Sequence, residues 1–250
     1  MPRRPRVETI GFHHLINRGV ARGDIFLKPL DFERFLELVL EAKERYAFTV
    51  HSFCLMNNHY HILLETTSEN LSLIARQINS KYAQYFNREY KRVGPLWQGR
   101  FKNYYVYDEC YLSILLKYIE RNPIKAKLTQ KIGEYKWCSS TFLLTWIHND
   151  LISGSILFDK DRFALLDIEM SKDELAKLDT LQKTTYIQNN EGLKREKQKS
   201  LLEYFMLVTS LKERDLAIKK AVLDGYKQSE IAEYLQVSRT TVSKVMAAKK

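Results

Sequence analysis

The sequence predicts an α+β fold, in which a split βαβ domain with an antiparallel sheet and flanking helices precedes a C-terminal all-α helix-turn-helix domain. Three observations favour this class. Hydrophobic periodicity in the N-terminal half switches between strand and helix spacing in the order β-α-β-β-α-β-α. Asn57 and Asn58 separate two strand-like runs, which is typical of a β-hairpin. Residues 215–250 hold three short amphipathic segments with helical spacing.

The first four elements follow from the spacing of apolar side chains. Residues 11–18, "GFHHLINR", are expected to form a strand. Residues 29–46 place apolar side chains at helical spacing, with Asp31 as the expected N-cap. Residues 47–56 and 59–65 are expected to be the two strands of the hairpin, joined by asparagines that tolerate the positive φ of a tight turn.

The next elements complete the N-terminal domain. An amphipathic helix is predicted over residues 70–90, followed by a Gly-Pro loop at residues 94–95 and a short strand at residues 103–108. A last helix over residues 110–122 is stopped by Pro123, because proline cannot donate the backbone hydrogen bond that would continue a helix.

The sequence divides into three expected regions. Residues 1–130 contain the split βαβ domain, and residues 206–250 contain the helix-turn-helix domain. Residues 131–205 contain no motif with recognisable chemistry and are expected to be a helical extension or linker packed on the first domain.

The C-terminal region has the pattern of a DNA-binding helix-turn-helix. A helix ends at Gly225, a second helix covers residues 228–235, and a third begins after Ser238, which can cap it. The side chains expected to face inward are Ile231, Ala232, Leu235, Val237, Val242 and Val245. The candidate contacts to duplex DNA are Arg239, Thr240, Thr241, Ser243 and Lys244. The alternative is an ordinary small helical bundle.

Composition narrows the class of protein. The formal net charge of +10 and the pI of about 9.3 favour an anionic partner, although a merely solvated basic surface is the alternative. The sequence lacks a continuous apolar run long enough to span a membrane and a signal-peptide pattern, so we expect no membrane association. The three cysteines are far apart and form no C-x-x-C pair, which fits a reducing, cytoplasmic location.

One basic segment points to nucleic acid. In residues 87–102, "NREYKRVGPLWQGRFK", arginines and lysines are interleaved with Tyr90, Trp97 and Phe101. Cations can bind phosphates while aromatic rings stack on unpaired bases. Nucleic acid is therefore the expected partner.

The run "LMNNHYHILLE" places two histidines one residue apart. If the run is a strand, His59 and His61 share one face, while Tyr60, Ile62 and Leu64 face the core. Such a pair can bind a metal ion, although most H-x-H pairs are ordinary strand residues. Glu65 is expected on the same face, as a weaker candidate ligand.

Tyr118 and Asn122 are four residues apart on a predicted helix, so they share a face. A phenol is a candidate nucleophile for phosphodiester cleavage, provided that a metal ion or a base promotes its deprotonation. Two imidazoles and one amide oxygen, with open positions for water and phosphate, would suit Mg²⁺ or Mn²⁺.

Four ordered segments together resemble a known family. They are "HHLINRGVARGDIFL", "FCLMNNHYHILLE", "GPLWQGRFKNYYV" and "YIERNPIKAKL". Between about residues 8 and 145, the sequence is similar to the single-tyrosine HUH transposases, specifically the REP-associated tyrosine transposases. The resemblance implies binding of single-stranded or hairpin DNA and cleavage of one strand. It also implies His59, His61 and Asn122 as ligands of a divalent metal, and Tyr118 as the nucleophile that forms a 5′-phosphotyrosine and releases a 3′-hydroxyl.

The DNA-binding residues predicted for this domain come from the same motifs and the basic segments. They are His14, Arg18, Arg88, Arg92, Trp97, Gln98, Arg100 and Lys102. The sequence departs from the family in two respects. It lacks the G-T-R-E-F stretch found near the N-terminus of many members, and it carries the helix-turn-helix region, which is absent from the minimal enzymes.

Other functions remain as alternatives. A DNA-binding regulator would use the helix-turn-helix without cutting DNA, and a related replication-initiation nuclease or relaxase would share the histidine pair. A metal-dependent RNase would share the basic surface but would not need the tyrosine. The sequence is compatible with a monomer and with a homodimer.

Overall fold

The computed structural model describes residues 8–145, 149–183, 186–189, 192–195, 201–206, 208, 210–223, 226 and 228–247. The chain forms two compact units. One consists of Glu8–Lys183, and the other combines Met1–Val7 with Thr184–Lys250.

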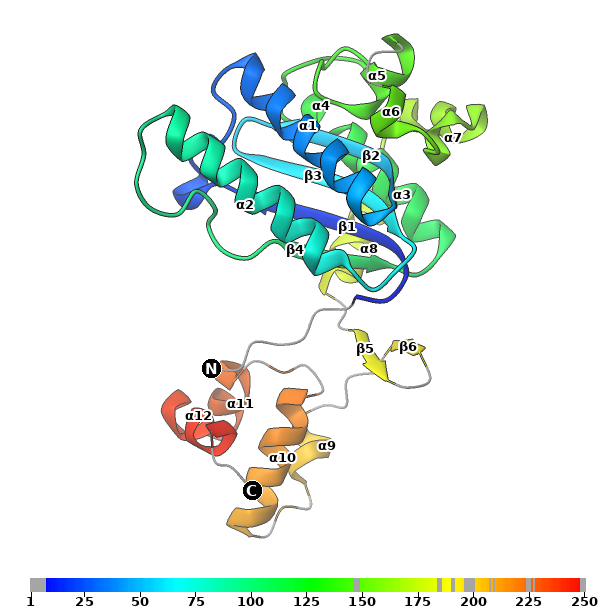
Figure 1. The fold of residues 1–250 in the computed structure, drawn as a ribbon. Helices are drawn as coiled ribbons and strands as arrows, with labels where there is room; N and C mark the ends of the chain where they lie inside the picture. Colours follow the sequence, from blue (N-terminus) through cyan, green and yellow to red (C-terminus); the bar gives the residue numbers. More distant parts are fainter. Residues whose placement is uncertain are drawn as a thin grey trace. The chain divides into compact units, whose positions relative to one another are not determined.

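A four-stranded antiparallel sheet forms the centre of the larger unit. Its strands are β1 (Gly11–Arg18), β2 (Phe48–Met56), β3 (His59–Thr66) and β4 (Lys102–Val106). The strand order is β2-β3-β1-β4, and all neighbouring strands are antiparallel (Figure 1). The predicted antiparallel sheet with flanking helices is thus confirmed.

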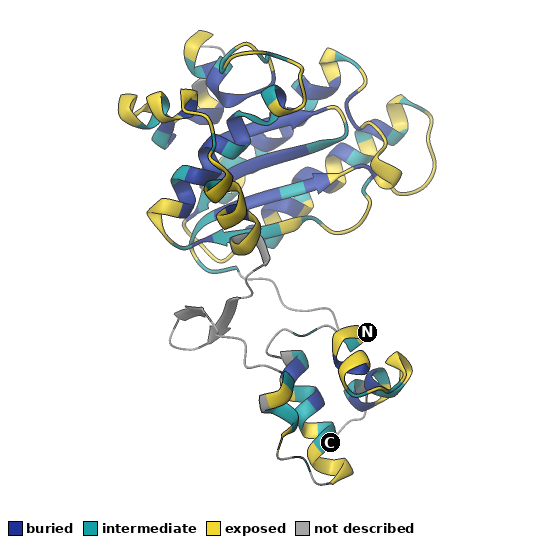
Figure 2. Cartoon of the chain, turned by 180° about the vertical axis from the view of Figure 1, so that it is seen from behind, coloured by how far each residue is buried: buried dark blue, intermediate teal, exposed yellow. Residues whose placement is uncertain are grey.

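Helices cover both faces of the sheet. The helices α1 (Pro29–Tyr46) and α2 (Leu71–Glu89) pack on one face, and α3 (Glu109–Glu120) packs on the other (Figure 1). Strand alternation sends Tyr60 and Ile62 into the core below α1 and α2, and Leu63 into the core below α3. Figure 2 shows the buried strands between helices whose outer sides are exposed. Each fully buried apolar side chain of this size contributes roughly 1.5–3 kcal/mol.

The predicted N-cap of α1 is wrong by three residues. The helix begins at Pro29 after Lys28, and Asp31 lies in its first turn. The Asp31 carboxylate accepts hydrogen bonds from the backbone N–H groups of Leu27 (2.8 Å) and Lys28 (3.1 Å). The Tyr85 hydroxyl also donates to it. Asp31 therefore reaches back to the helix start as the carboxylate of a capping box and ties α1 to α2.

The hairpin turn differs from the sequence expectation. Asn57 and Asn58 are not among the described residues with positive φ. Instead, contacts from outside the hairpin hold the turn. The Asn57 carbonyl accepts from the backbone N–H groups of Ile25 (2.7 Å) and Phe26 (3.0 Å), and the Asn58 carbonyl accepts from that of Gly19 (2.9 Å). The segment between β1 and α1 thus packs on the turn.

The chain after α3 forms an extension on the same unit. Pro123 lies in the first turn of α4 (Asn122–Lys125), directly after the end of α3. The remaining helices are α5 (Ser139–Thr145), α6 (Asn149–Ile152), α7 (Lys160–Ala164) and α8 (Lys172–Lys183). Near Trp137 the extension runs beside the outer strand β2, where the Leu55 N–H donates to the Trp137 carbonyl (3.0 Å).

Glu120, at the end of α3, joins that helix to β2 and to the extension. Its buried carboxylate accepts hydrogen bonds from the Ser52 hydroxyl (2.6 Å), the Ser139 hydroxyl and the Ser140 N–H (3.1 Å). Burial raises the pKa of this carboxyl above its usual range, although the hydrogen bonds favour the charged form.

Glu120 should therefore make folding stability depend on pH. Because its folded-state pKa is raised, the associated stability is complete below the unfolded pKa of about 4.3 and is lost as pH rises through the folded-state pKa. We expect Glu120→Gln to weaken this decline in the free energy of unfolding. Urea denaturation between about pH 4 and pH 8 measures it, with the exposed Glu44→Gln as the control. Equal pH slopes for Glu120→Gln and wild type would contradict the assignment.

The described residues of the smaller unit form a short hairpin and four helices. Strands β5 (Tyr186–Asn189) and β6 (Gly192–Arg195) pair antiparallel. The helices are α9 (Leu201–Phe205), α10 (Leu211–Leu223), α11 (Gln228–Tyr234) and α12 (Arg239–Ala247). Their buried core consists of Ile218, Ala221, Ile231, Ala232, Val242 and Val245.

Candidate active site

The two histidines of β3 lie on the sheet face that α3 covers. In the sheet register, His61 pairs with Ile16 of β1 and Cys54 of β2, and His59 pairs with Arg18. The predicted alternation along β3 is therefore present. The imidazole rings of His59 and His61 are 5.1 Å apart between centroids.

Tyr118 of α3 faces this histidine pair. Its ring lies perpendicular to that of His61, with a centroid distance of 5.5 Å. Helical spacing places Tyr118 over the sheet because its neighbours Leu115 and Ile119 are buried in the core beneath α3. The histidine pair of β3 and the phenol of α3 thus face each other.

These side chains line an open pocket of about 550 Å³. Basic and polar side chains surround the histidines and the tyrosine there. Besides His59, His61 and Tyr118, the polar lining residues are Asn17, Arg18, Arg22, Asn58, Gln98, Arg100, Lys102 and Tyr104. The pocket therefore combines cations, neutral hydrogen-bonding groups and a candidate nucleophile.

The hydrogen bonds of the two histidines leave one nitrogen of each imidazole ring available to coordinate a metal ion. His59 Nδ1 lies 2.6 Å from Asn58 Oδ1, an atom that can only accept, so Nδ1 carries the proton and Nε2 keeps a lone pair. His61 Nδ1 lies 2.9 Å from His14 Nε2, which leaves His61 Nε2 available. This arrangement matches metal-binding histidines, which use one ring nitrogen for the metal and the other for a supporting hydrogen bond.

Burial keeps both histidines neutral. It lowers the pKa of His61 well below the usual value, and the neighbouring His14 and His59 add to this effect. Burial also lowers the pKa of His59, assisted by the positive charge of Arg18. Only neutral imidazole can ligate a metal, so both side chains are in the required form near neutral pH.

Tyr118 is protonated near neutral pH. Burial raises the pKa of its phenol, and the neighbouring Tyr104 and Cys54 raise it further. A neutral phenol is a weak nucleophile, so attack on a phosphate requires its proton to be removed during the reaction.

The donor set fits a divalent metal with open coordination positions. Two neutral imidazole nitrogens lie side by side, but among the described residues no third His, Cys, Asp or Glu completes a cluster with them. Asn122 begins α4 one turn after Tyr118, and its amide nitrogen donates to the Tyr118 carbonyl (2.7 Å). It does not line the pocket, so its role as third ligand stays a prediction.

Two predicted DNA contacts have other positions. His14 is fully buried and bonds to His61, so its imidazole cannot reach DNA in this structure. Trp97 donates from its indole nitrogen to the Asn79 carbonyl (2.9 Å) and packs against Tyr60 and Tyr82. His14 is thus fully buried and Trp97 partly buried, and their roles as DNA contacts stay predictions.

The other predicted contacts divide into two groups. Arg18, Gln98, Arg100 and Lys102 line the pocket. Arg88 and Arg92, which are exposed, do not line it. Arg92 stacks over the Phe86 ring, with 5.5 Å between the guanidinium carbon and the ring centroid.

Glu65, the weaker candidate ligand, is engaged elsewhere. Its carboxylate lies 3.1 Å from His51 Nε2. It is not among the residues that line the pocket.

Sequence reasoning did not assign four polar side chains that line this pocket, namely Asn17, Arg22, Asn58 and Tyr104. Asn58 was interpreted only as a turn residue, and Arg22 was not predicted to belong to the site. The position of Asn58 directly before His59 could have indicated that Asn58 lies near the site. The presence of Arg22 in the pocket depends on the backbone conformation of residues 19–23, which the local sequence does not predict.

The sheet, the histidine pair and the facing tyrosine lie in the part of the chain that is similar to known transposases. Residues 11–122 match the family model described as "Transposase IS200 like". A Haemophilus influenzae protein described as a REP-associated tyrosine transposase is 25% identical over 107 residues, which cover 38% of this chain and 61% of that protein. The chain thus spans less than two thirds of this curated relative, and the resemblance predicted from the sequence is confirmed.

Two solved structures are also similar to the chain. One is a REP-associated tyrosine transposase bound to a REP hairpin, with 15% identity and a TM-score of 0.49, covering 68% of this chain and 93% of that one. The other is a transposase from Deinococcus radiodurans, with 15% identity and a TM-score of 0.35, covering 48% of this chain and 97% of that one.

Proposed function

We propose that the pocket of the larger unit cleaves and rejoins one strand of single-stranded or hairpin DNA through a covalent link to Tyr118. The observation that carries this proposal is the meeting of Tyr118 with His59 and His61 in one basic pocket. The family match and the curated relative support DNA as the substrate.

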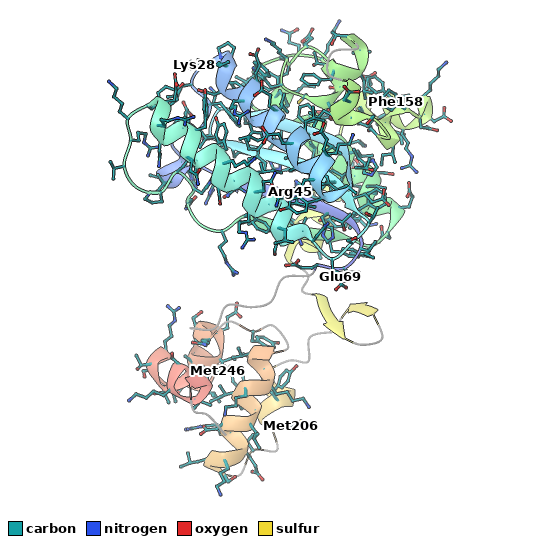
Figure 3. The ribbon with its side chains drawn as sticks, viewed as in Figure 1. Lys28, Arg45, Glu69, Phe158, Met206 and Met246 are labelled. Atoms are coloured by element: carbon teal, nitrogen blue, oxygen red, sulfur yellow. The ribbon has the colours of Figure 1, made fainter. Side chains whose placement is uncertain are left out.

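The cations of the pocket support phosphate binding. Elsewhere, several basic side chains have acidic partners. For example, Lys28 Nζ lies 2.5 Å from Glu89 Oε1, at the start of α1 and the end of α2 (Lys28 is labelled in Figure 3). None of the ion pairs among the described residues involves Arg18, Arg22, Arg100 or Lys102. These four cations are therefore available to bind a phosphodiester backbone.

The reaction proceeds by transfer of a phosphoryl group. The Tyr118 oxygen attacks phosphorus, the bond from phosphorus to the 3′-oxygen breaks, and a 5′-phosphotyrosine forms. The phenol proton passes to water in the pocket, and the departing 3′-oxygen gains a proton. His59, His61 and Asn122 would hold Mg²⁺ or Mn²⁺, which polarises the phosphate and stabilises its developing charge. Attack by a 3′-hydroxyl on the phosphotyrosine reverses these steps and reseals DNA.

Strand polarity tests this proposal. Hairpin DNA with single-stranded flanks, taken from the locus of this chain, is labelled at either end and incubated with protein and Mg²⁺ or Mn²⁺. We expect the 3′-labelled fragment to become attached to protein, and the 5′-labelled fragment to be released with a 3′-hydroxyl that a polymerase can extend. Attachment of the 5′-labelled fragment, or no attachment on any flank, would overturn the proposal.

Arg100 should contribute to DNA binding through charge. We expect Arg100→Ala to weaken binding of single-stranded DNA and to lower the slope of log affinity against log salt by about 0.7, as for loss of one phosphate contact. The control is Arg76→Ala, which removes the same charge from an exposed site on α2 outside the pocket. Fluorescence anisotropy over a salt series measures both. Equal slopes for Arg100→Ala and Arg76→Ala would contradict the role of Arg100.

The smaller unit supports a second DNA contact, and we propose that α11 and α12 act as a helix-turn-helix on duplex DNA. The Ser238 hydroxyl accepts from the Thr241 N–H (3.1 Å) and so caps α12. Arg239, Thr240 and Lys244 are exposed on α12, while Thr241 is partly buried. Recognition helices use such N-terminal side chains to contact base edges.

Arg239→Ala should weaken duplex binding by roughly 5- to 150-fold, since one specific side-chain contact contributes roughly 1–3 kcal/mol. Hairpin cleavage should keep its wild-type rate. The matched control is Lys212→Ala, at an exposed position of α10. Duplex binding on a fragment of the native locus measures the first effect. Unchanged duplex affinity, or cleavage lost together with it, would contradict a separate duplex-binding role.

The alternative of a non-cleaving regulator is less well supported, because such a protein does not need a tyrosine beside a metal-ligand pair. The strand-polarity experiment separates the two functions. As to membranes, the described residues contain no helix of the length and apolarity needed to cross one.

A further inference from the structure

Asn58 lies between two parts of the candidate site. It ends the turn between β2 and β3 and lines the pocket beside His59. Its side-chain oxygen lies 2.6 Å from His59 Nδ1, and its side-chain nitrogen donates to the Arg22 carbonyl (3.1 Å). One amide therefore contacts both a candidate metal ligand and a segment that contributes a pocket cation.

The contact with His59 selects one form of the imidazole ring. Because the amide oxygen can only accept, it stabilises the tautomer with a proton on Nδ1. The lone pair then stays on Nε2, the atom that would ligate a metal. Without this acceptor, the ring is free to place its proton on Nε2, and that tautomer cannot bind a metal through the same atom.

The contact with Arg22 supports a strained segment. Ala21 and Arg22 both have positive φ, at 52° and 61°. Left-handed backbone costs roughly 1–2 kcal/mol for each non-glycine residue, so surrounding contacts must hold it. One such contact is the hydrogen bond from the Asn58 side chain to the Arg22 carbonyl. A second is the hydrogen bond from the Gly19 N–H to the Asn58 carbonyl (2.9 Å). Arg22 itself lines the pocket.

We propose that Asn58 is a positioning residue that sets the tautomer of His59 and fixes the backbone of Arg22, so that metal binding and phosphate binding depend on one side chain. The metal part rests on the proposed function. The tautomer and backbone parts concern this chain alone and are measurable without metal.

Three variants separate the two contacts. Asn58→Ala removes both. Asn58→Asp keeps an acceptor for His59 but loses the donor to the Arg22 carbonyl. The control is Asn57→Ala, at the exposed neighbouring position of the same turn. The backbone carbonyl of Asn57, which the substitution keeps, accepts from the N–H groups of Ile25 and Phe26. Thermal unfolding of each variant establishes that it is folded.

The metal-free protein gives the first readout. Long-range ¹H–¹⁵N NMR of the imidazole rings should show His59 protonated on Nδ1 in wild type, Asn57→Ala and Asn58→Asp. Asn58→Ala should show a population protonated on Nε2. Protonation of His59 on Nε2 in wild type, or no change in Asn58→Ala, would overturn the inference whether or not the protein binds metal.

Binding gives the second readout. Mn²⁺ affinity, measured by electron paramagnetic resonance without DNA, should fall on the order of 10- to 100-fold in Asn58→Ala, as for loss of other residues that orient metal ligands. Asn58→Asp, which keeps the acceptor for His59, should retain Mn²⁺ affinity. Asn58→Ala, which loses the contact with the Arg22 carbonyl and adds no charge to the pocket, should bind single-stranded DNA more weakly than wild type and Asn57→Ala in EDTA. Equal loss of Mn²⁺ in both Asn58 variants would overturn the inference. No Mn²⁺ binding by wild type would instead contradict the metal part of the proposed function.

Discussion

Replacing Tyr118 with phenylalanine is expected to abolish the covalent protein–DNA adduct. The substitution removes only the oxygen that would attack phosphorus and keeps the ring that packs against His61. Adduct formation should therefore fall by several orders of magnitude, as it does when the nucleophile of other covalent enzymes is removed. Denaturing gel electrophoresis with 3′-labelled hairpin DNA measures it.

The pocket offers a matched control for this prediction. Tyr104 also lines the pocket but belongs to β4 rather than α3. Tyr104→Phe should still form the adduct, and both variants should bind uncleaved DNA with affinity close to that of wild type. An adduct from Tyr118→Phe at the wild-type level would show that another group is the nucleophile.

Substitution of the histidine pair is expected to have the second largest effect. His59→Ala and His61→Ala each remove one of the two imidazoles available to a metal, so Mn²⁺ affinity and cleavage should both fall by at least about 100-fold. Combining the two should cost little more than either alone, because the residues act as one unit. Isothermal titration with Mn²⁺ and cleavage rates over a range of Mn²⁺ concentrations measure these effects.

A comparison of conditions separates loss of metal from loss of folding. DNA binding in EDTA should be preserved in both histidine variants, because the pocket cations are unchanged. High Mn²⁺ should partly restore cleavage in a variant that keeps one histidine. Full wild-type cleavage in EDTA would contradict a metal-dependent reaction.

Local patterns were sufficient to predict the parts of the site that belong to regular elements. The period of two along β3 placed His59 and His61 on one face and Tyr60 in the core, and helical spacing identified the helix that bears Tyr118. These patterns depend only on neighbours in sequence, which is why they could be used without a structure.

Features that depend on distant contacts could not be predicted in the same way. Trp97 looked like a stacking surface because basic residues surround it, but its indole packs on Tyr82 of α2. His14 is buried because β3, β4 and α3 surround it, which follows from strand order rather than from its own segment. The left-handed conformation at Arg22 likewise depends on contacts with the hairpin turn.

The central claim is that Tyr118, beside the histidine pair, becomes covalently joined to a 5′-phosphate of DNA. Mass spectrometry of the trapped adduct after proteolysis and nuclease treatment tests it most directly. We expect one modified peptide, carrying a 5′-linked nucleotide on Tyr118. A nucleotide on Tyr104 or another residue, or no linked peptide from a reaction in which DNA was cut, would contradict it.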